Sequence, residues 1–302
     1  MLTMKRKINR VGTSTLTVSL PSKWARKYGV NVGDEVDVVE DGKSLVIGSE
    51  QKRTLGKKVV EVQSTKEFVK RLLYVPYVLG YEEIEVTFKE QKVMEKIEQT
   101  VEIMSGFEII DQRPGFCLIQ NIAKEEETKF KEIFKRLVFL VQTMGDELEK
   151  GLKEDSENLN GLPPMRRMAN KLTLFCGRIL HLKGHKDQDR TIRYFLIVNL
   201  LEKIAIHLRD LGDHFKDRKS KYTTNEIKWV KYVNEQLKLF TKLFFDEKKM
   251  DQLADFRRKT WEVAHYPENN LLKGIKTKED FYVVARVVMI LDKLDQIMQE
   301  VH

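Results

Sequence analysis

Hydrophobic and polar positions alternate near the start of the chain, over residues 15–20. The aliphatic residues there are Leu16, Val18 and Leu20, and the residues between them are Thr15, Thr17 and Ser19. A period of two predicts a half-buried strand with an aliphatic inner side and a small, polar outer side. Pro21-Ser22 then begins a short helix that Trp24 and Tyr28 anchor and Gly29 ends, and strand patterns return over residues 30–39 and 45–47. The pattern predicts a small module with the order strand, short helix, strand, turn, strand.

The next segment, residues 58–122, mixes strand and helix patterns. Ser64 and Glu67 have the spacing of a capping box, which predicts a helix that ends at Gly80. A strand is expected over residues 84–88, a second helix over 89–105, and a hairpin formed by residues 107–110 and 116–120. The result is an α+β layer that resembles a ferredoxin-like unit. It has no Gly-rich phosphate loop and no clustered carboxylates, so we expect a structural spacer.

Residues 123–302 show helical periodicity throughout. Apolar residues recur at alternating spacings of four and three in five long segments, and a shorter helix is expected over 250–264. The long segments run from Phe130 to Leu148, Met165 to Leu182, Ile197 to Phe215, Val230 to Phe244 and Phe281 to Met298. Leu201-Glu202-Lys203-Ile204 and Leu291-Asp292-Lys293-Leu294 lie ninety residues apart, each in the last long helix of a set of three. Six helices in two similar sets predict a pair of three-helix bundles.

Basic residues are concentrated in the first module. The first acidic residue is Asp34, and the basic residues that precede it are Lys5, Arg6, Lys7, Arg10, Lys23, Arg26 and Lys27. Residues 1–58 carry twelve Lys and Arg against six Asp and Glu, which accounts for +6 of the formal net charge of +8. Positive charge on one small folded module is typical of a protein that binds the phosphate backbone of nucleic acid. The alternative is a solvated, lysine-rich surface that only confers solubility.

Composition and motifs limit the class of protein. The chain has 302 residues, 41% hydrophobic and 33% charged, which fits a globular protein of two or three domains. It contains neither a long uncharged apolar run nor the apolar core of a signal peptide, so we expect a cytoplasmic protein without membrane insertion. Cys117 and Cys176 are isolated and flanked by apolar residues, which is typical of small buried hydrophobes. The common catalytic motifs are missing, so we expect a regulator that is not an enzyme and needs no cofactor.

Several short motifs of the first module occur in a recognisable order. They are the basic stretch from Lys5 to Arg10, Val11-Gly12, the strand-ending Leu20-Pro21, Gly29-Val30 and Gly33-Asp34-Glu35-Val36. Together they resemble the AbrB/SpoVT swapped-hairpin DNA-binding domain over about residues 4–50. The resemblance implies that two chains interlace their hairpins into one small β-barrel, and that basic residues of the first strand and short helix contact DNA. Arg6 and Arg26 fall on positions that are basic in this family, whereas Thr13 and Ala25 stand where members often have further basic residues.

The small size of the module also favours a homodimer. About 50 residues with few apolar side chains cannot bury enough surface alone, and strand exchange between two chains doubles the core. A two-fold axis then places two basic faces where they suit pseudo-palindromic double-stranded DNA. We therefore expect DNA contacts from Lys5, Arg6, Lys7, Arg10, Lys23, Arg26 and Lys27.

The repeated motifs of the helical segment resemble the PhoU family of phosphate-signalling regulators, whose two three-helix repeats carry acidic residues spaced by four. Glu202 and Asp292 match the first acid of each pair, but Ile206 and Gln296 stand at the second positions. One carboxylate per motif leaves a metal ion short of ligands, so we do not expect a multinuclear cluster. Weak metal candidates are Glu202 with His207 and Asp292 with Asp295, and the alternative for all four is surface salt bridging.

These patterns predict three parts: an AbrB/SpoVT-like DNA-binding and dimerisation domain over 1–57, an α+β middle domain over 58–122 and a PhoU-like helical domain over 123–302. We expect a DNA-binding transcriptional regulator linked to phosphate uptake. The PhoU resemblance implies that its helical domain senses a signal or docks a phosphate transporter or sensor protein. Two alternatives stay open: an adaptor of phosphate transport or signalling that does not bind DNA, and a metal-binding helical-bundle protein or enzyme.

Overall fold

The computed structural model of the protein describes residues 5–41, 44–48, 55–64, 68–123, 130–154, 156–185, 187, 189–216, 218, 222–246, 250–266 and 274–300. The chain divides into two compact units, residues 1–53 and residues 54–302. The second unit includes both the middle and the helical segments. No helix within the described ranges is long and apolar enough to cross a membrane.

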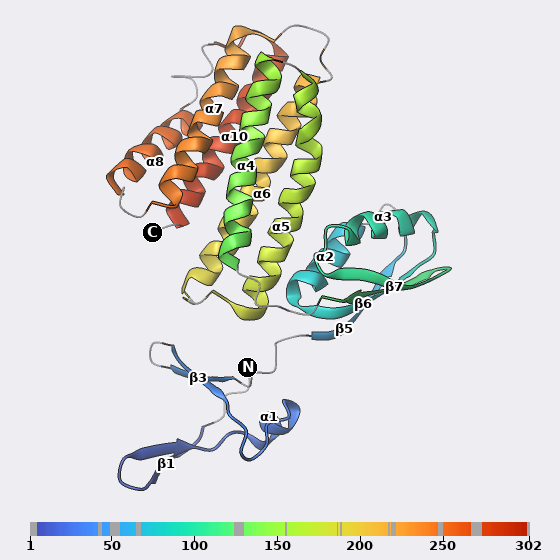
Figure 1. The fold of residues 1–302 in the computed structure, drawn as a ribbon, viewed down its shortest axis with the longest axis vertical. Coiled ribbons are helices and arrows are strands. Elements are labelled where there is room, and N and C mark those ends of the chain that lie inside the picture. The colour runs from blue at the N-terminus through green and yellow to red at the C-terminus, as the bar shows by residue number, and fades with distance from the viewer. Residues whose placement is uncertain are drawn as a thin grey trace. The chain divides into compact units, whose positions relative to one another are not determined.

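The first unit has one more strand at its start than the predicted order, which it follows from there on (Figure 1). Strands β1 (Ile8–Val11) and β2 (Thr15–Val18) form an antiparallel hairpin, helix α1 (Ser22–Lys27) follows, and β3 (Asp37–Asp41) pairs with β4 (Ser44–Gly48). The strand predicted from residue 30 begins only at Asp37. The reason is local, because Gly29 and Gly33 have φ angles of 64° and 97°, and the Asn31 amide donates a hydrogen bond to Asp34 Oδ2 at 2.7 Å. These interactions form turns in which a strand cannot start.

The described side chains of the first unit form no buried core within a single chain. Every described side chain from residue 5 to 48 is exposed or only partly buried. The β1–β2 hairpin and the β3–β4 hairpin form two separate two-stranded sheets. A two-stranded hairpin alone is marginally stable in water, so each hairpin gains stability from any further surface that packs on it.

The second unit begins with a four-stranded sheet of order β5-β6-β8-β7, made of β5 (Leu55–Val62), β6 (Tyr81–Phe88), β8 (Phe116–Asn121) and β7 (Phe107–Arg113). Strands β5 and β6 are parallel, and the other neighbours are antiparallel. Helices α2 (Val69–Leu79) and α3 (Lys92–Val101) pack on it, and their apolar residues share its core. Strand β5 begins before residue 58, at Leu55, where its backbone amide donates to Gly80 O at 3.0 Å.

Three expectations for this layer were wrong in detail. The ferredoxin-like resemblance fails because β6 leads into α3 and the β7–β8 hairpin comes last, whereas a ferredoxin-like unit runs β-α-β-β-α-β. Helix α2 begins at Val69 behind Phe68, not at Ser64, and Glu67 of the predicted capping box lies outside the described residues. Helix α3 is shorter than residues 89–105. The predicted hairpin and the stops at Gly80 and Gly106, with φ angles of 92° and 84°, are confirmed.

The remaining elements are helical, as predicted (Figure 1). Within the described residues the six predicted helices are α4 (Phe130–Lys153), α5 (Leu162–Lys183), α6 (Asp189–Lys216), α7 (Thr224–Phe244), α8 (Met250–His265) and α10 (Lys278–Glu300), with a 3-10 turn η1 (Ser156–Gly161) before α5. Helices α4, α5 and α6 pack on one another, as do α7, α8 and α10, and both sets share one core. Phe281 was expected to face that core but is 62% exposed, and Val283, Val284 and Val287 are buried there instead.

Arg178 of α5 connects the helical part to the α+β layer by hydrogen bonds. Its guanidinium is almost fully buried and donates to Tyr77 O at 2.6 Å, Tyr81 O at 3.2 Å and Glu82 Oε1 at 2.6 Å. It also lies over the rings of Tyr77 and Phe107. A buried charge with three acceptors and two aromatic faces is well compensated, so α5 and α2 are held together by polar as well as apolar contacts.

Candidate nucleic-acid interface

Helix α1 presents three basic side chains on one face. Lys23, Arg26 and Lys27 have the i, i+3, i+4 spacing that aligns side chains along a helix, and all three are exposed. Trp24 and Tyr28 occupy the adjoining side, with ring centroids 5.6 Å apart. The basic face of α1 therefore points into solvent, and Trp24 and Tyr28 on the adjoining side can hold the helix in place by packing.

The hairpin separates its residues into two faces, which the strand register defines. Arg10 pairs with Leu16, and Ile8 pairs with Val18, so these four side chains share one face. The opposite face carries Asn9, Val11, Thr15 and Thr17. The predicted aliphatic and polar sides are thus present, but Arg10 lies on the aliphatic side. Lys5, Arg6 and Lys7 precede β1 and are exposed.

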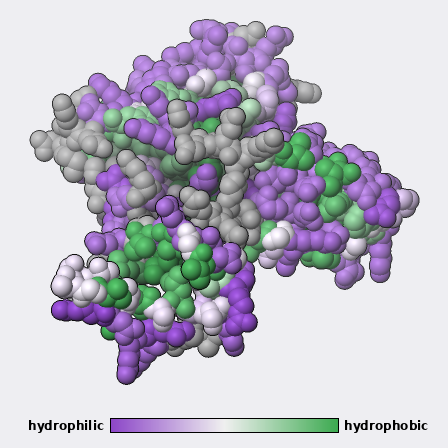
Figure 2. Space-filling model, turned by 60° about the horizontal axis from the view of Figure 1, so that its bottom comes forward, coloured by the Kyte–Doolittle hydropathy of each residue, from purple (hydrophilic) through white to green (hydrophobic). Residues whose placement is uncertain are grey.

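The aliphatic face of the hairpin is open to solvent in a single chain. Ile8 is 68% exposed, Leu16 63% and Val18 46%, and Val38 and Leu45 of the second hairpin are also exposed. Figure 2 shows hydrophobic side chains gathered on this unit, at the lower left of the view, with hydrophilic residues around them. Contiguous exposed apolar side chains on a small domain mark an interaction surface.

The electrostatics of this unit suit an anionic polymer. Among the described residues, the seven predicted basic side chains, Lys5, Arg6, Lys7, Arg10, Lys23, Arg26 and Lys27, are exposed, and the first acidic residue after them in the chain is Asp34. Asp34 is already engaged by the Asn31 amide. Exposed Lys and Arg side chains can contact phosphates and displace their counterions.

The four weak metal candidates are held by other side chains. Glu202 accepts from Arg166 at 2.9 Å, and His207 Nδ1 lies 3.2 Å from Arg286 Nη1. Asp292 is engaged by Lys293 at 2.7 Å and Gln296 at 2.9 Å, and Asp295 by Arg257 at 3.4 Å and Gln299 at 2.6 Å. No three His, Cys, Asp or Glu side chains come together as a metal site in the part of the chain that the structure describes. Their partners fit the ion-pair alternative.

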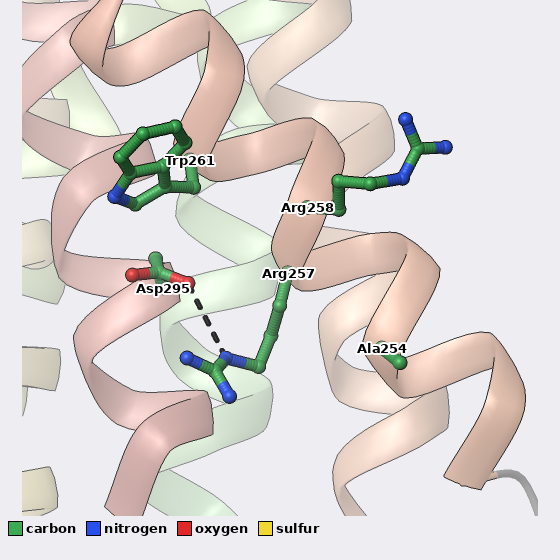
Figure 3. A pocket seen from close by; sticks show the side chains of 5 residues that line it. All are labelled: Ala254, Arg257, Arg258, Trp261 and Asp295. Atoms are coloured by element: carbon green, nitrogen blue, oxygen red, sulfur yellow. Dashed lines mark hydrogen bonds and ion pairs between the residues drawn. The ribbon is translucent and has the colours of Figure 1, made fainter.

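A pocket of about 350 Å³ between α8 and α10 was not predicted from the sequence (Figure 3). It is lined by Ala254, Arg257, Arg258, Trp261 and Asp295. In Figure 3 Arg257 reaches toward Asp295, while Arg258 points away from the indole of Trp261. Arg258 is paired with Asp255 at 2.8 Å and Glu262 at 3.3 Å. Both guanidinium groups are therefore paired with carboxylates. The adjacent Arg257-Arg258 and the following Trp261 on one helix were the available sequence signal.

Comparison with known proteins identifies part of the first unit. Residues 10–55 match the family model described as "Antidote-toxin recognition MazE, bacterial antitoxin". The match begins within β1 and covers β2, α1 and the β3–β4 hairpin, so it overlaps most of the segment with the AbrB/SpoVT resemblance. No curated protein and no solved structure matches the chain. The N-terminal segment is therefore similar to a MazE/AbrB-type domain.

Proposed function

We propose that this protein is a dimeric DNA-binding transcriptional regulator in which two copies of residues 1–53 interlock into one barrel. The observation that carries the proposal is the state of the first unit in a single chain: it buries no described side chain, yet exposes an aliphatic hairpin face and a basic helix face. The match to a MazE-type family model over residues 10–55 supports the same reading.

The aliphatic hairpin face supports dimerisation. Ile8, Leu16 and Val18 would be removed from water if the hairpin of a second copy covered them. Full burial of one such side chain contributes about 1.5–3 kcal/mol, so three of them in each copy supply a substantial part of the stability of a small barrel. Arg10 on that face then lies at the edge of the shared core, where its long aliphatic stem can be covered while its charge stays in water.

The basic face of α1 supports DNA binding. A two-fold axis duplicates Lys23, Arg26 and Lys27, and the exposed residues Lys5, Arg6 and Lys7 lie before β1 in each copy. Phosphate contacts of this kind fix the position of a protein on duplex DNA, and base contacts add the sequence preference.

The test compares two double substitutions in the full chain by fluorescence anisotropy on duplex DNA at several salt concentrations. Lys23→Ala with Arg26→Ala removes two basic residues of α1, and the matched control, Arg258→Ala with Lys259→Ala, removes two exposed basic residues of α8. A dimer with the first pair changed should lose about three to four units of the slope of log K against log salt, and the control should keep the wild-type slope. Equal effects of the two pairs, or no binding even in dilute buffer, would refute DNA binding by α1.

The link to phosphate uptake rests on the resemblance of the Glu202 and Asp292 motifs of α6 and α10 to those of the PhoU family. In this proposal the helical part acts by binding a partner or signal in the cytoplasm, without catalysis. Crosslinking of the protein to its genomic DNA sites tests the link, because occupancy near phosphate-transport promoters is expected. Occupancy confined to other promoters would leave a DNA-binding regulator of a different process.

A second candidate function is favoured by the family match alone. That family is described by antidote-toxin recognition, so in this alternative the first unit neutralises a toxin protein. Growth arrest on deletion of this gene, with rescue by loss of one other gene, would support the antitoxin function. Normal growth of the deletion strain favours the regulator.

A further inference from the structure

The pocket between α8 and α10 combines an aromatic wall with a buried carboxylate. Trp261 is 40% exposed, whereas Asp295 is only 2% exposed. His265 stacks on the indole of Trp261 with ring centroids 4.7 Å apart, which holds the indole in its orientation. In Figure 3 Asp295 lies between this indole, above it, and the guanidinium of Arg257, below it. A ligand in the α8/α10 pocket therefore meets an aromatic ring and an ion pair together.

The ion pair offers both a donor and an acceptor to a ligand. Arg257 reaches Asp295 Oδ1 through Nε at 3.4 Å, and its two Nη atoms lie beyond that contact (Figure 3). Asp295 Oδ2 accepts from Gln299 at 2.6 Å, so Oδ1 is the oxygen with the weaker hydrogen bond. Because the pair is neutral as a whole, an ionic ligand would add an unpaired charge beside a buried carboxylate. A hydroxyl group fits better, since it both accepts and donates a hydrogen bond.

The first set of three helices has a corresponding ion pair. Arg166 of α5 pairs with Glu202 of α6 at 2.9 Å, as Arg257 of α8 pairs with Asp295 of α10. The two arginines lie ninety-one residues apart, close to the ninety residues that separate the related motifs of α6 and α10. Asp295 stands one turn beyond Asp292, which matches Glu202 in those motifs. The two ion pairs therefore occupy corresponding places to within one helical turn.

In the first set an aromatic hydroxyl lies at this place. Helix α2 packs on α5, and Asn170, four residues after Arg166, donates to Tyr74 Oη at 3.4 Å. Burial raises the pKa of Tyr74, and the charges of the Arg166 ion pair also act on its hydroxyl, so the pair lies near it. In the second set Trp261 stands four residues after Arg257. Among the described elements no helix packs on α8 as α2 packs on α5.

We propose that the α8/α10 pocket binds a hydroxy-aromatic ring. The ring packs on Trp261, and its hydroxyl accepts a hydrogen bond from Arg257 and donates one to Asp295. A cavity of about 150 Å³ holds benzene, so a pocket of about 350 Å³ admits one substituted ring. The ring belongs either to a small molecule or to a tyrosine of a partner protein. This proposal concerns the second unit alone and does not depend on the dimer or on DNA binding.

Binding of p-cresol to the full chain tests the proposal, with p-xylene as the ligand of the same shape that lacks a hydroxyl. The three tryptophans are labelled with fluorotryptophan, and the fluorine NMR resonance of Trp261 is assigned with Trp261→Phe. We expect p-cresol to shift this resonance saturably and to bind at least about tenfold more tightly than p-xylene, because the polar groups of the site stay unpaired without the hydroxyl. Arg257→Met should weaken p-cresol at least about fivefold. The matched control Arg258→Met should not, because Arg258 points away from the indole (Figure 3).

Further ligands separate the outcomes. N-acetyltyrosinamide should bind more tightly than p-cresol if a protein supplies the ring, and no more tightly if a small molecule does. Equal affinity for p-cresol and p-xylene overturns the proposal, and this comparison holds even if Arg257→Met fails to fold. Tighter binding of benzoate than of p-cresol, lost in Arg257→Met, identifies an anion site and also overturns it. The absence of a saturable shift with p-cresol has the same consequence.

Discussion

Replacement of Arg178 by Met should weaken the packing of α5 on the α+β layer. The substitution keeps an unbranched apolar stem but removes hydrogen bonds to Tyr77 O, Tyr81 O and Glu82. Glu82 also accepts from Asn121 at 2.8 Å, so it retains one polar partner after the change. Removal of one member of a buried ion pair costs about 3–5 kcal/mol. We expect a loss of that size in the free energy of unfolding of the second unit.

Two other substitutions serve for comparison: one keeps the positive charge at residue 178, and the other removes an exposed arginine. Arg178→Lys keeps the positive charge but cannot span the backbone carbonyl of Tyr77 and the carboxylate of Glu82 at once, so a loss of about 1.5–3 kcal/mol is expected. Arg113→Met is the control, because Arg113 also pairs with a carboxylate, at 2.6 Å, and lies over an aromatic ring, but its side chain is 66% exposed. An exposed pair is worth less than about 1 kcal/mol.

The assay is urea unfolding followed by far-UV circular dichroism, together with native-state hydrogen exchange of α2 and β6. Relative to the wild-type chain, Arg178→Met should raise the exchange rate of α2 and β6 more than that of α4, because α2 and β6 contain the lost contacts. If Arg178→Met and Arg113→Met lower the unfolding free energy equally, the Arg178 contacts do not stabilise the junction between the helices and the sheet.

Three further changes test other features of the second unit by chemical unfolding. Asp280→Ala should lower the free energy of unfolding by about 2–3 kcal/mol, because Asp280 is buried and accepts hydrogen bonds from the backbone amides of Lys276 and Thr277 at 3.0 Å each. The control Glu279→Ala, at the exposed neighbouring position, should lower it by less than about 0.5 kcal/mol. Gly212→Ala should cost about 1–3 kcal/mol because its Cβ would overlap the buried Leu162 side chain, whereas Gly161→Ala meets open space and should be near neutral. Burial, followed by the charge of Arg286, lowers the pKa of His207 below its ordinary value of 6.5, so the unfolded chain binds more protons as the pH falls through that value, and the free energy of unfolding should fall as the pH drops below about 6.5. His207→Gln should reduce that fall, and an unchanged pH profile would contradict the assignment.

The helical part was predictable because its signal is repeated and local. Leu137, Leu201, Leu237 and Leu291 all sit in periodic apolar stripes, and all four are buried. Phe281 was wrongly predicted to be buried because the same periodicity, continued from Val284 toward the start of α10, includes it, although the buried stripe begins after it. The turn region before β3 was misread because its β-branched valines favour strands, while Gly29 and Gly33 determine the backbone.

The interaction surfaces were only partly predictable. The basic residues of the first unit are visible as a run of like charges, but the face of Arg10 depends on its pairing with Leu16, which only the register reveals. The role of Arg178 could not be predicted, since its acceptors Tyr77 and Tyr81 lie about a hundred residues earlier in the chain.

The positions of these contacts limit how the helical part could influence DNA. Arg178 of α5 binds the carbonyls of Tyr77 and Tyr81, and Gly80 between them binds the amide of Leu55, where the chain leaves for the N-terminal unit. A ligand or partner that moves α5 therefore acts within one hydrogen bond of the segment that joins the two units. Such binding changes DNA affinity only if it favours one arrangement of that connection over another, and DNA must then change the affinity for the ligand by the same factor. Arg178→Met should weaken this coupling. It should leave the DNA affinity proposed for the basic face of α1 unchanged, because Lys23 and Arg26 belong to the other unit.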